Sequence, residues 1–179
     1  ESVMNLTIRK ATLKDLDEVA VIYEKIHSAE ENGEVCIGWQ RGVYPERTTA
    51  LQALQRGDLF VEEQEGRIVG TAILNQIQVD IYKKAHWQYP ASEDQVMVIH
   101  TLVIHPEVKS QGLGQAFARF YEEYARQQGC SYLRIDTNEK NTRARRFYQK
   151  LQYKEIDILP CTFNGIQGVN LVLLEKKID

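Results

Sequence analysis

The sequence predicts a single α/β domain over residues 1–179, and three observations lead to that prediction. Hydrophobic periodicity places strands and helices in the order β α α β β β α β α β β. No internal repeat, linker or shift in composition divides the chain. Hydrophobic residues make up 43% and charged residues 26% of the sequence, which is the usual mixture for a chain that buries a sizeable core.

The N-terminal part of the chain predicts a strand, a helix and an irregular segment. Residues 6–11 have the pattern of a strand, and Thr12 with Asp15 three residues later is typical of a helix N-terminus. Apolar residues then recur at helical spacing, so we expect this helix to end near Ser28. The segment 30–44 follows no regular period.

A second helix and a hairpin come next. Pro45 suits the start of a helix, and Gly57 suits its end. Residues 59–63 and 68–74 predict two strands joined by a short hairpin loop. Residues 80–94 form a second irregular segment that is rich in aromatic side chains.

The longest apolar strand is expected at residues 96–104, and its continuous apolar character favours burial on both faces. Apolar residues between 113 and 124 fall at offsets 0, 3, 4, 7, 8 and 11, which predicts an amphipathic helix that ends at Gly129. Residues 132–137 predict the next strand, and residues 144–151 predict a short helix.

Two strands complete the expected order of elements. They lie near residues 153–158 and 169–175, on either side of an Asn164-Gly165 turn. Asn-Gly is a strong signal for a tight hairpin turn, because both central residues of such a turn need positive φ angles.

Charge and residue usage exclude several classes of protein. The net charge of −3 comes from 22 basic and 25 acidic residues, which argues against a general nucleic-acid binder. No apolar run approaches the ~20 residues that span a bilayer, and the N-terminus lacks the apolar core of a signal peptide. We therefore expect no membrane association and a cytoplasmic location.

Cysteine and histidine usage argue against disulfide bonds and against a catalytic metal site. The three cysteines are widely spaced and form no CxxC pair, which favours reduced thiols. The four histidines lack the HExxH spacing of a zinc site, so we expect no catalytic metal.

A glycine-bearing turn between residues 104 and 115 is the strongest candidate for chemistry. An apolar strand ends there, Gly112 and Gly114 follow, and a long helix begins. Such a turn directs successive backbone N–H groups at one point beside the positive end of a helix, which suits a phosphate. A Walker motif is absent, and Phe117 stands where a dinucleotide fingerprint needs its third glycine. From the glycines alone, an ordinary βα turn remains an equal alternative.

Two motifs resemble those of the GNAT superfamily of N-acetyltransferases. The run Lys109-Ser110-Gln111-Gly112-Leu113-Gly114 resembles its acyl-CoA motif, except that Lys109 replaces the usual Arg or Gln. The run from Asn141 through Ala144 and Tyr148 to Leu151 resembles the family's second motif, with Gln152-Tyr153 in place of Gly-Phe. The resemblance is specific over about residues 96–153.

The resemblance implies a fold and a co-substrate. The fold is a central mixed, mostly antiparallel sheet of about seven strands with about four helices. The strands at 96–104 and 132–137 would splay apart to hold the acyl-CoA. The co-substrate is acetyl-CoA. The residues that the resemblance assigns to it are Leu102, Val103, Ile104, Lys109, Ser110, Gln111, Gly112, Leu113, Gly114, Gln115, Asn141 and Tyr148.

The resemblance also implies how an amine would attack the thioester. Tyr148 is expected to act as general acid to the CoA thiolate, with a core aromatic residue as the alternative interpretation. His100, or an ordered water, is expected to act as general base. Strand alternation places His100 on one face with Leu102 and Ile104, and the sequence around His100 is similar to arylalkylamine acetyltransferases. A structural histidine is an equal alternative, and His105 is expected to be structural.

The acceptor site is the least specified part of the sequence. Trp39, Tyr44 and Trp87 lie in the two irregular segments, where they form an acceptor pocket or cover the core. We expect a small-molecule amine or a peptide amine as acceptor, with a homodimer left open. The basic run at 140–150 is either a solvated helix face or a contact for the 3′-phosphate. A non-catalytic acetyl-CoA-binding module and a nucleotide-binding domain are the competing functions.

Overall fold

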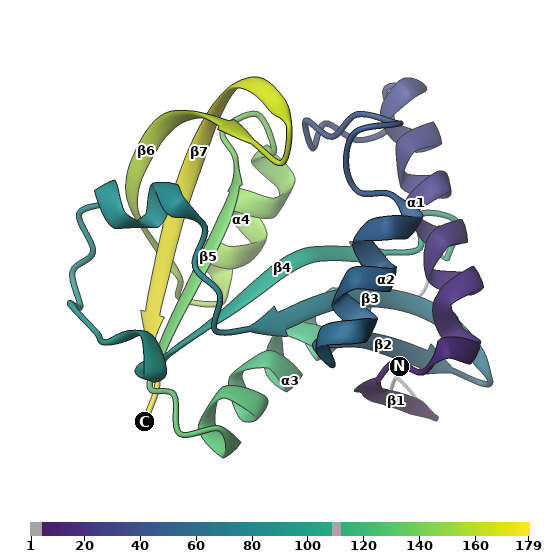
Figure 1. Cartoon of the computed structure of the whole chain (residues 1–179), viewed down its shortest axis with the longest axis horizontal. Coiled ribbons are helices and arrows are strands. Elements are labelled where there is room, and N and C mark those ends of the chain that lie inside the picture. Colours follow the sequence, from purple (N-terminus) through teal and green to yellow (C-terminus); the bar gives the residue numbers. More distant parts are fainter. Residues whose placement is uncertain (1–4, 109–111) are drawn as a thin grey trace.

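The protein is described from a computed structural model, which describes residues 5–108 and 112–179. Within these residues, seven strands form one sheet in the order β1-β2-β3-β4-β5-β7-β6, in which only the neighbours β4 and β5 run parallel (Figure 1). The mixed, mostly antiparallel sheet and the predicted order of elements are therefore confirmed. The strands are β1 (Leu6–Lys10), β2 (Leu59–Gln64), β3 (Arg67–Asn75), β4 (Val96–Ile104), β5 (Tyr132–Asn138), β6 (Lys154–Phe163) and β7 (Ile166–Lys177).

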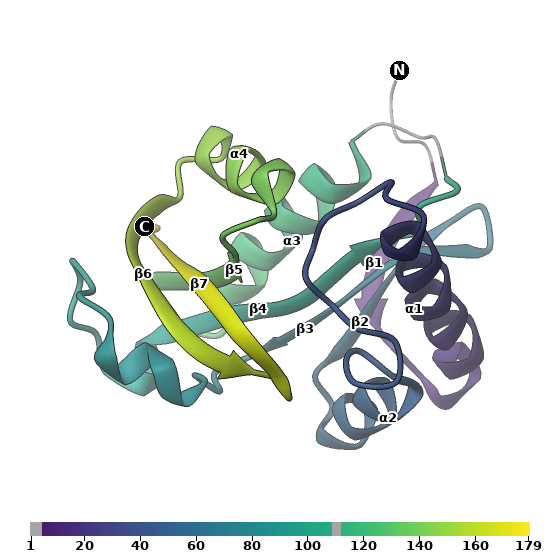
Figure 2. The same cartoon turned by 90° about the horizontal axis from the view of Figure 1, so that it is seen from above.

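Four helices cover the two faces of this sheet (Figure 2). The apolar sides of α1 (Leu16–Glu31) and α2 (Arg47–Arg56) pack on one face, where Val19, Ile22 and Ala53 are buried. The opposite face carries α3 (Leu113–Gln127) and α4 (Thr142–Lys150). The segment between β3 and β4, which contains short 3₁₀ turns at Asp80–Lys84 and Glu93–Gln95, covers the strands on the β7 side.

The parallel pair β4 and β5 splays apart along its length. Their pairing runs from Val96 opposite Tyr132 to Val98 opposite Arg134 and then stops, although both strands continue. Beyond that point the side of β4 that faces β5 has no strand partner among the described residues. The splayed pair that the sequence resemblance implied is therefore confirmed, and the site described below lies in the opening.

The final hairpin is longer than the sequence predicts. β6 extends to Phe163 and β7 begins at Ile166, so only Asn164 and Gly165 form the turn, with φ angles of 51° and 79°. These positive angles are those of the expected tight turn. The two strands therefore extend closer to the turn than the predicted ranges of about 153–158 and 169–175.

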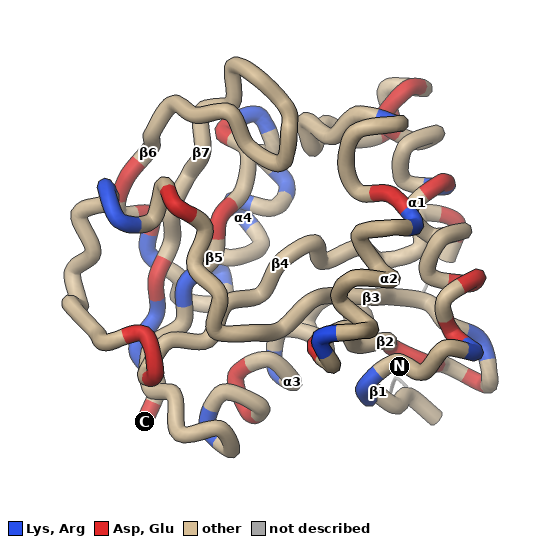
Figure 3. Tube along the Cα trace, viewed as in Figure 1, with Lys and Arg blue, Asp and Glu red and all other residues tan. Residues whose placement is uncertain are grey.

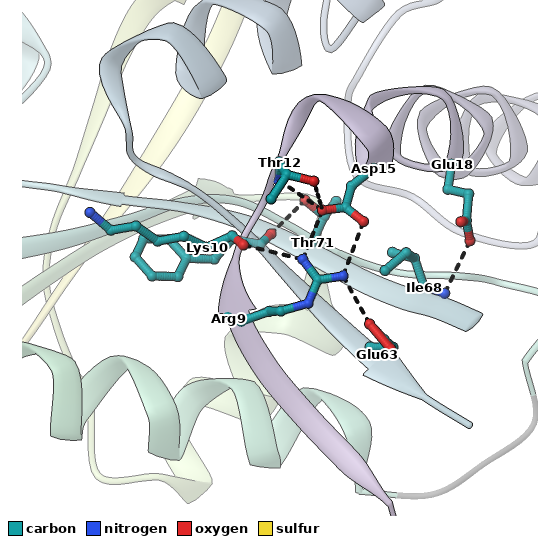
Figure 4. Close-up of polar contacts among 9 residues, drawn as sticks. Arg9, Lys10, Thr12, Asp15, Glu18, Glu63, Ile68 and Thr71 are labelled. Atoms are coloured by element: carbon teal, nitrogen blue, oxygen red, sulfur yellow. Dashed lines mark hydrogen bonds and ion pairs between the residues drawn. The ribbon is translucent and has the colours of Figure 1, made fainter. Parts of the chain in front are cut away.

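The N-terminal strand is held by a network of charged groups (Figure 4). The Arg9 guanidinium donates to Asp15 at 2.8 Å and to Glu63 at 2.8 Å. Asp15 also accepts from the Thr12 backbone N–H at 2.8 Å, as expected for a helix start. The bond from Arg9 holds the pKa of Asp15 below its usual range, so this network persists at neutral pH.

Glu62 on β2 is a buried carboxyl group with an unusual environment. Its side chain is 0% exposed, and neither carboxylate oxygen has a hydrogen-bond partner among the described residues. Gly70 on β3 makes room for it, because a Cβ at that position would lie 2.7 Å from Glu62 Oε1. Burial raises the pKa of Glu62 to about 8.

We expect Glu62→Gln to stabilise the protein more at high pH than at low pH. The pKa of Glu62 in the folded protein lies above its unfolded value of roughly 4.3. The protonated side chain therefore contributes stability that is fully present below this unfolded pKa and is lost as pH rises through about 8. Between pH 5 and pH 8.5 the ionised group should cost about 4 kcal/mol. Urea unfolding of both proteins at these pH values measures the difference.

The neighbouring Glu63→Gln is the matched control for this prediction. Glu63 is a partly exposed partner of Arg9, and its replacement should give no gain that grows with pH. An equal gain for Glu62→Gln at both pH values would contradict the buried ionisation.

The described residues contain neither a membrane-spanning helix nor a metal-binding cluster. None of the helices within residues 5–108 and 112–179 has the length and apolar content to cross a membrane. In the same ranges, no group of three or more His, Cys, Asp and Glu side chains is arranged to hold a metal ion.

Candidate functional site

Two hollows meet where β4 and β5 separate. The first, which we call the outer groove, has a volume of about 760 Å³ and lies between α4, the end of β4 and the start of the loop that joins α1 to α2. The second, the inner cavity, has a volume of about 120 Å³ and lies deeper in the splay. Residues that line both hollows are Ile37, Leu102, Asn141, Ala144 and Tyr148.

The outer groove brings together many of the predicted cofactor residues. Leu102, Val103 and Ile104 come from β4, and Gly114 comes from the first turn of α3. The side chain of Val103 packs toward α1 and α2, so this residue offers only its backbone to the groove. Asn141 and Tyr148 line the groove from the α4 side. Lys109, Ser110 and Gln111 lie outside the described residues.

The start of α3 is described from Gly112 onward. Gly112 caps the helix with a φ of 84°, a conformation that favours glycine. At Gly114 a Cβ would lie 3.5 Å from the Phe147 ring and 3.9 Å from Ile104 Cγ1, so the helix packs closely on α4 and β4. Leu113 is buried and Gln115 is exposed. Backbone N–H groups at such a helix start favour a phosphate.

Asn141 has a structural role that its motif did not reveal. Its side-chain oxygen accepts from the Ala144 backbone N–H at 3.1 Å, which caps the N-terminus of α4. The same residue lines both hollows.

Tyr148 stands at the junction of the two hollows. Its side chain is 7% exposed, and it lines both the outer groove and the inner cavity. Burial, together with the nearby carboxylate of Asp136, raises the pKa of its phenol. The hydroxyl is therefore protonated at neutral pH, the form that a general acid requires.

The prediction that His100 shares a face with Leu102 and Ile104 is wrong. Thr101 has a φ of 52°, and the register with β3 shifts there, so one extra residue bulges from β4. A bulge inserts a residue and reverses the alternation that follows it. His100 lies opposite Ile73 on the α2 side of the sheet, whereas Leu102 and Ile104 pack toward α3.

His100 nevertheless borders the inner cavity. Its Nε2 lies 2.7 Å from Asn75 Oδ1, which also accepts from the Ile77 backbone N–H. Burial lowers the pKa of His100 to about 4. The imidazole is therefore neutral at pH 7, but it is a weak proton acceptor.

Asp136 on β5 is the residue of the inner cavity that sequence reasoning missed. The Tyr82 hydroxyl donates to its Oδ2 at 2.6 Å. Burial raises its pKa to about 6, and the bond from Tyr82 opposes this shift. Its signal in the sequence is a single acid in the middle of a strand, a position that usually disfavours Asp.

The three aromatic residues that were predicted for the acceptor pocket lie in two different places. Trp39 and Tyr44 line the inner cavity, where their rings meet edge to face with centroids 6.2 Å apart. Trp87 lines neither hollow: the Arg134 guanidinium carbon lies over its ring, 4.2 Å from the centroid, and its indole N–H donates to the Tyr82 carbonyl at 2.8 Å. His105 is buried, and its Nδ1 accepts from the Glu107 backbone N–H, as a structural histidine would.

The basic residues near α4 also have different partners. Arg145 forms a two-pronged ion pair with Glu155, so it stabilises the contact between α4 and β6. Lys140 and Arg143 border the outer groove. Among the described residues of the basic run at 140–150, these two cations border that groove.

Comparison with known proteins gives a consistent result. The sequence pattern of the acetyltransferase (GNAT) family matches residues 19–153. The uncharacterized N-acetyltransferase MJ1530 of Methanocaldococcus jannaschii is 25% identical over 173 residues, which cover 96% of this chain and 92% of that protein. MJ1207, an uncharacterized N-acetyltransferase of the same organism, is 23% identical over 159 residues, and the match spans 86% of this chain but only 62% of the relative.

Solved structures share the same fold. An acetyltransferase of the GNAT family from Streptococcus agalactiae superposes with a TM-score of 0.81 at 20% identity, covering 98% of this chain and 97% of that chain. The yncA protein of Salmonella typhimurium, solved with its cofactor acetyl-CoA, gives a TM-score of 0.67 at 17% identity, with 98% and 95% of the two chains covered.

Proposed function

The chain belongs to the acetyltransferase (GNAT) family, and we propose that it transfers the acetyl group of acetyl-CoA to the nitrogen of a primary amine by direct attack. Members of this family are acyltransferases that use acetyl-CoA as co-substrate. The observation that carries the proposal is the meeting of the two hollows at Tyr148, because a transfer reaction needs a donor site and an acceptor site with one shared point.

The outer groove is the proposed site of acetyl-CoA. Beyond Val98 the side of β4 that faces β5 has no strand partner, so its backbone groups are free to bond an extended amide chain. The helix start at Gly112 supplies N–H groups for the pyrophosphate, and Lys140 and Arg143 lie where they can meet a further phosphate. The chemistry of these groups fits the charged and amide portions of acetyl-CoA.

Two residues of the chain are proposed to move protons. Bound acetyl-CoA supplies a thioester carbonyl, and the amine forms a C–N bond there as the C–S bond breaks. Asp136 accepts a proton from the incoming ammonium at its carboxylate, and Tyr148 donates its phenolic proton to the departing sulfur. The nitrogen then loses a second proton, which restores the Tyr148 hydroxyl. The first proton passes from Asp136 to solvent, so each turnover releases one proton.

Asp136 suits the proton acceptor better than His100 does. A base works best when its pKa lies near the working pH, and the pKa of Asp136 is about 6 whereas that of His100 is about 4. Asp136 also lies beside Tyr148, which feels its charge. His100 remains the competing base, because it borders the same cavity.

We expect acetyl-CoA to raise the melting temperature of the protein and Gly112→Val to abolish that rise. A β-branched residue does not tolerate a φ of 84°, so the helix start would reorganise and lose its phosphate contacts. Thermal denaturation with increasing acetyl-CoA measures the shift, and detection of free thiol with an amine present measures turnover.

Gly129→Val is the matched control for this experiment. Gly129 follows the other end of α3 with a φ of 78°, and no described atom lies within 4 Å of its added Cβ. This variant should carry similar backbone strain but keep the shift. An unchanged shift in Gly112→Val would contradict the proposed site, and binding without thiol release for any amine would favour a non-catalytic module.

A further inference from the structure

The loop between α1 and α2, residues 32–46, forms a roof over the inner cavity. Figures 1 and 2 show this loop passing over β4 toward the tip of the β6–β7 hairpin. The Tyr44 hydroxyl bonds the Thr101 hydroxyl on β4. Gly38 rests directly on Asn138 at the end of β5, where an added Cβ would overlap the amide group.

The roof also reaches the hairpin. A Cβ added at Gly165 would lie 3.2 Å from Val43 Cγ1, so the tip of the hairpin and the loop are in contact. Phe163 and Ile166 extend the same contact into the lining of the cavity. The loop thus touches β4, β5 and the hairpin, and it covers the inner cavity between them.

The roof is itself firmly attached to α1. The backbone N–H groups of Ile37 and Gly38 both donate to the Glu30 carboxylate, at 3.0 Å and 2.9 Å. Arg41 donates to Glu31 at 2.9 Å and to Ser28 at 3.0 Å. These contacts favour a preformed roof over one that folds back to admit a chain.

Aromatic, aliphatic and uncharged polar side chains line the inner cavity, together with a single acid. Among the described lining residues, Asp136 is the one carboxylate, and none is Lys or Arg. The hairpin residues 158–174 contain no charged side chain, and Figure 3 shows the tip of the hairpin in tan. The aromatic and aliphatic residues that line the inner cavity include Trp39, Tyr44, Val79, Phe163, Ile166 and Val169.

We propose that the acceptor is a compact primary monoamine with an apolar body, whose ammonium group pairs with Asp136 and whose body contacts Trp39 and Phe163. This inference rests on the proposed function and narrows it. The cavity of about 120 Å³ is smaller than the roughly 300–1,000 Å³ of usual ligand pockets, which favours a small acceptor.

The charges and the small size of the inner cavity disfavour other classes of amine acceptor. A polyamine would bring a second ammonium group into a cavity that offers no second carboxylate among its described lining. A free amino acid would bring a carboxylate that no lining Lys or Arg can pair. A peptide N-terminus would bring further backbone polar groups into a cavity of about 120 Å³, which is small for a chain.

The test measures kcat/KM by thiol release for four acceptors at saturating acetyl-CoA: 2-phenylethylamine, spermidine, a tripeptide with a free alanine N-terminus, and glutamate. We expect 2-phenylethylamine to exceed each of the others by at least ~10-fold, since one apolar group in a pocket is worth about 10–200-fold. The variant Trp39→Ala should reduce this preference by lowering turnover of 2-phenylethylamine more than that of spermidine. Trp87→Ala, which changes a tryptophan outside both hollows, should keep the order of acceptors.

The possible outcomes separate the identity of the acceptor from the acetyltransferase activity itself. Fastest turnover of the tripeptide, spermidine or glutamate would overturn the monoamine assignment while leaving the acetyltransferase proposal intact. The same order of acceptors in Trp39→Ala as in the parent, with undiminished preference, would also overturn it. Thiol release with none of the four acceptors would count against the amine acetyltransferase proposal itself and remove the basis of this inference.

Discussion

We expect Asp136→Asn to lower kcat/KM for the amine by about 10²–10⁴-fold at pH 7, the usual contribution of one general base. The substitution keeps the size of the side chain, and the Asn carbonyl can still accept from the Tyr82 hydroxyl. Acetyl-CoA should therefore stabilise the variant as it stabilises the parent. Activity of the variant should recover as pH rises, because a free amine no longer needs a proton acceptor.

The pH profile of the parent distinguishes Asp136 from His100. If Asp136 is the base, kcat/KM falls as pH drops through about 6, because the carboxyl group then becomes protonated. If His100 is the base, the same fall lies near pH 4. Loss of activity in His100→Gln together with full activity in Asp136→Asn would contradict our assignment.

Asp157→Asn is the matched control for Asp136→Asn. Asp157 lies on β6, accepts from His86 at 2.8 Å and lines neither hollow. Its replacement should leave the rate and the pH profile as they are in the parent. Equal losses in the two variants would mean that the effect comes from the fold rather than from proton transfer.

The second large effect is expected for Tyr148→Phe. Loss of the hydroxyl removes the proposed proton donor to the leaving thiolate, so kcat should fall by about 10²–10⁴-fold. The ring keeps its packing against Phe147 and Tyr153, with centroids 5.2 Å and 5.8 Å away. Steady-state kinetics and thermal shift with acetyl-CoA together should show a reduced kcat with little change in binding.

Tyr153→Phe is a control of the same chemistry at a neighbouring ring. The Tyr153 hydroxyl donates to Glu122 at 2.9 Å and faces neither hollow. This variant should lose a hydrogen bond to a carboxylate, which is worth about 1.5–3 kcal/mol of stability, but it should keep kcat. A normal kcat in Tyr148→Phe would assign proton donation to another group, such as water.

The sequence by itself determined the order and type of the elements. Helical spacing, the Thr12 start, the glycine stop at Gly57 and the Asn164-Gly165 turn all depend on neighbours along the chain. For the same reason the bounds of β4 were predicted correctly. The two motifs also indicated the family and the groove at the start of α3, because each motif is a local run of residues.

The tertiary structure alone decided which side chains share the site. A single bulge at Thr101 turned His100 away from Leu102 and Ile104, and no period in the sequence announces a bulge. Asp136 became a candidate base only because the splay of β4 and β5 exposes it to a cavity beside Tyr148. Trp87 lies outside the predicted pocket because it packs on Arg134, a partner distant in the sequence. Periodicity records which face of its own element a residue occupies, whereas a site depends on contacts between elements, and those are set by the packing of the whole chain.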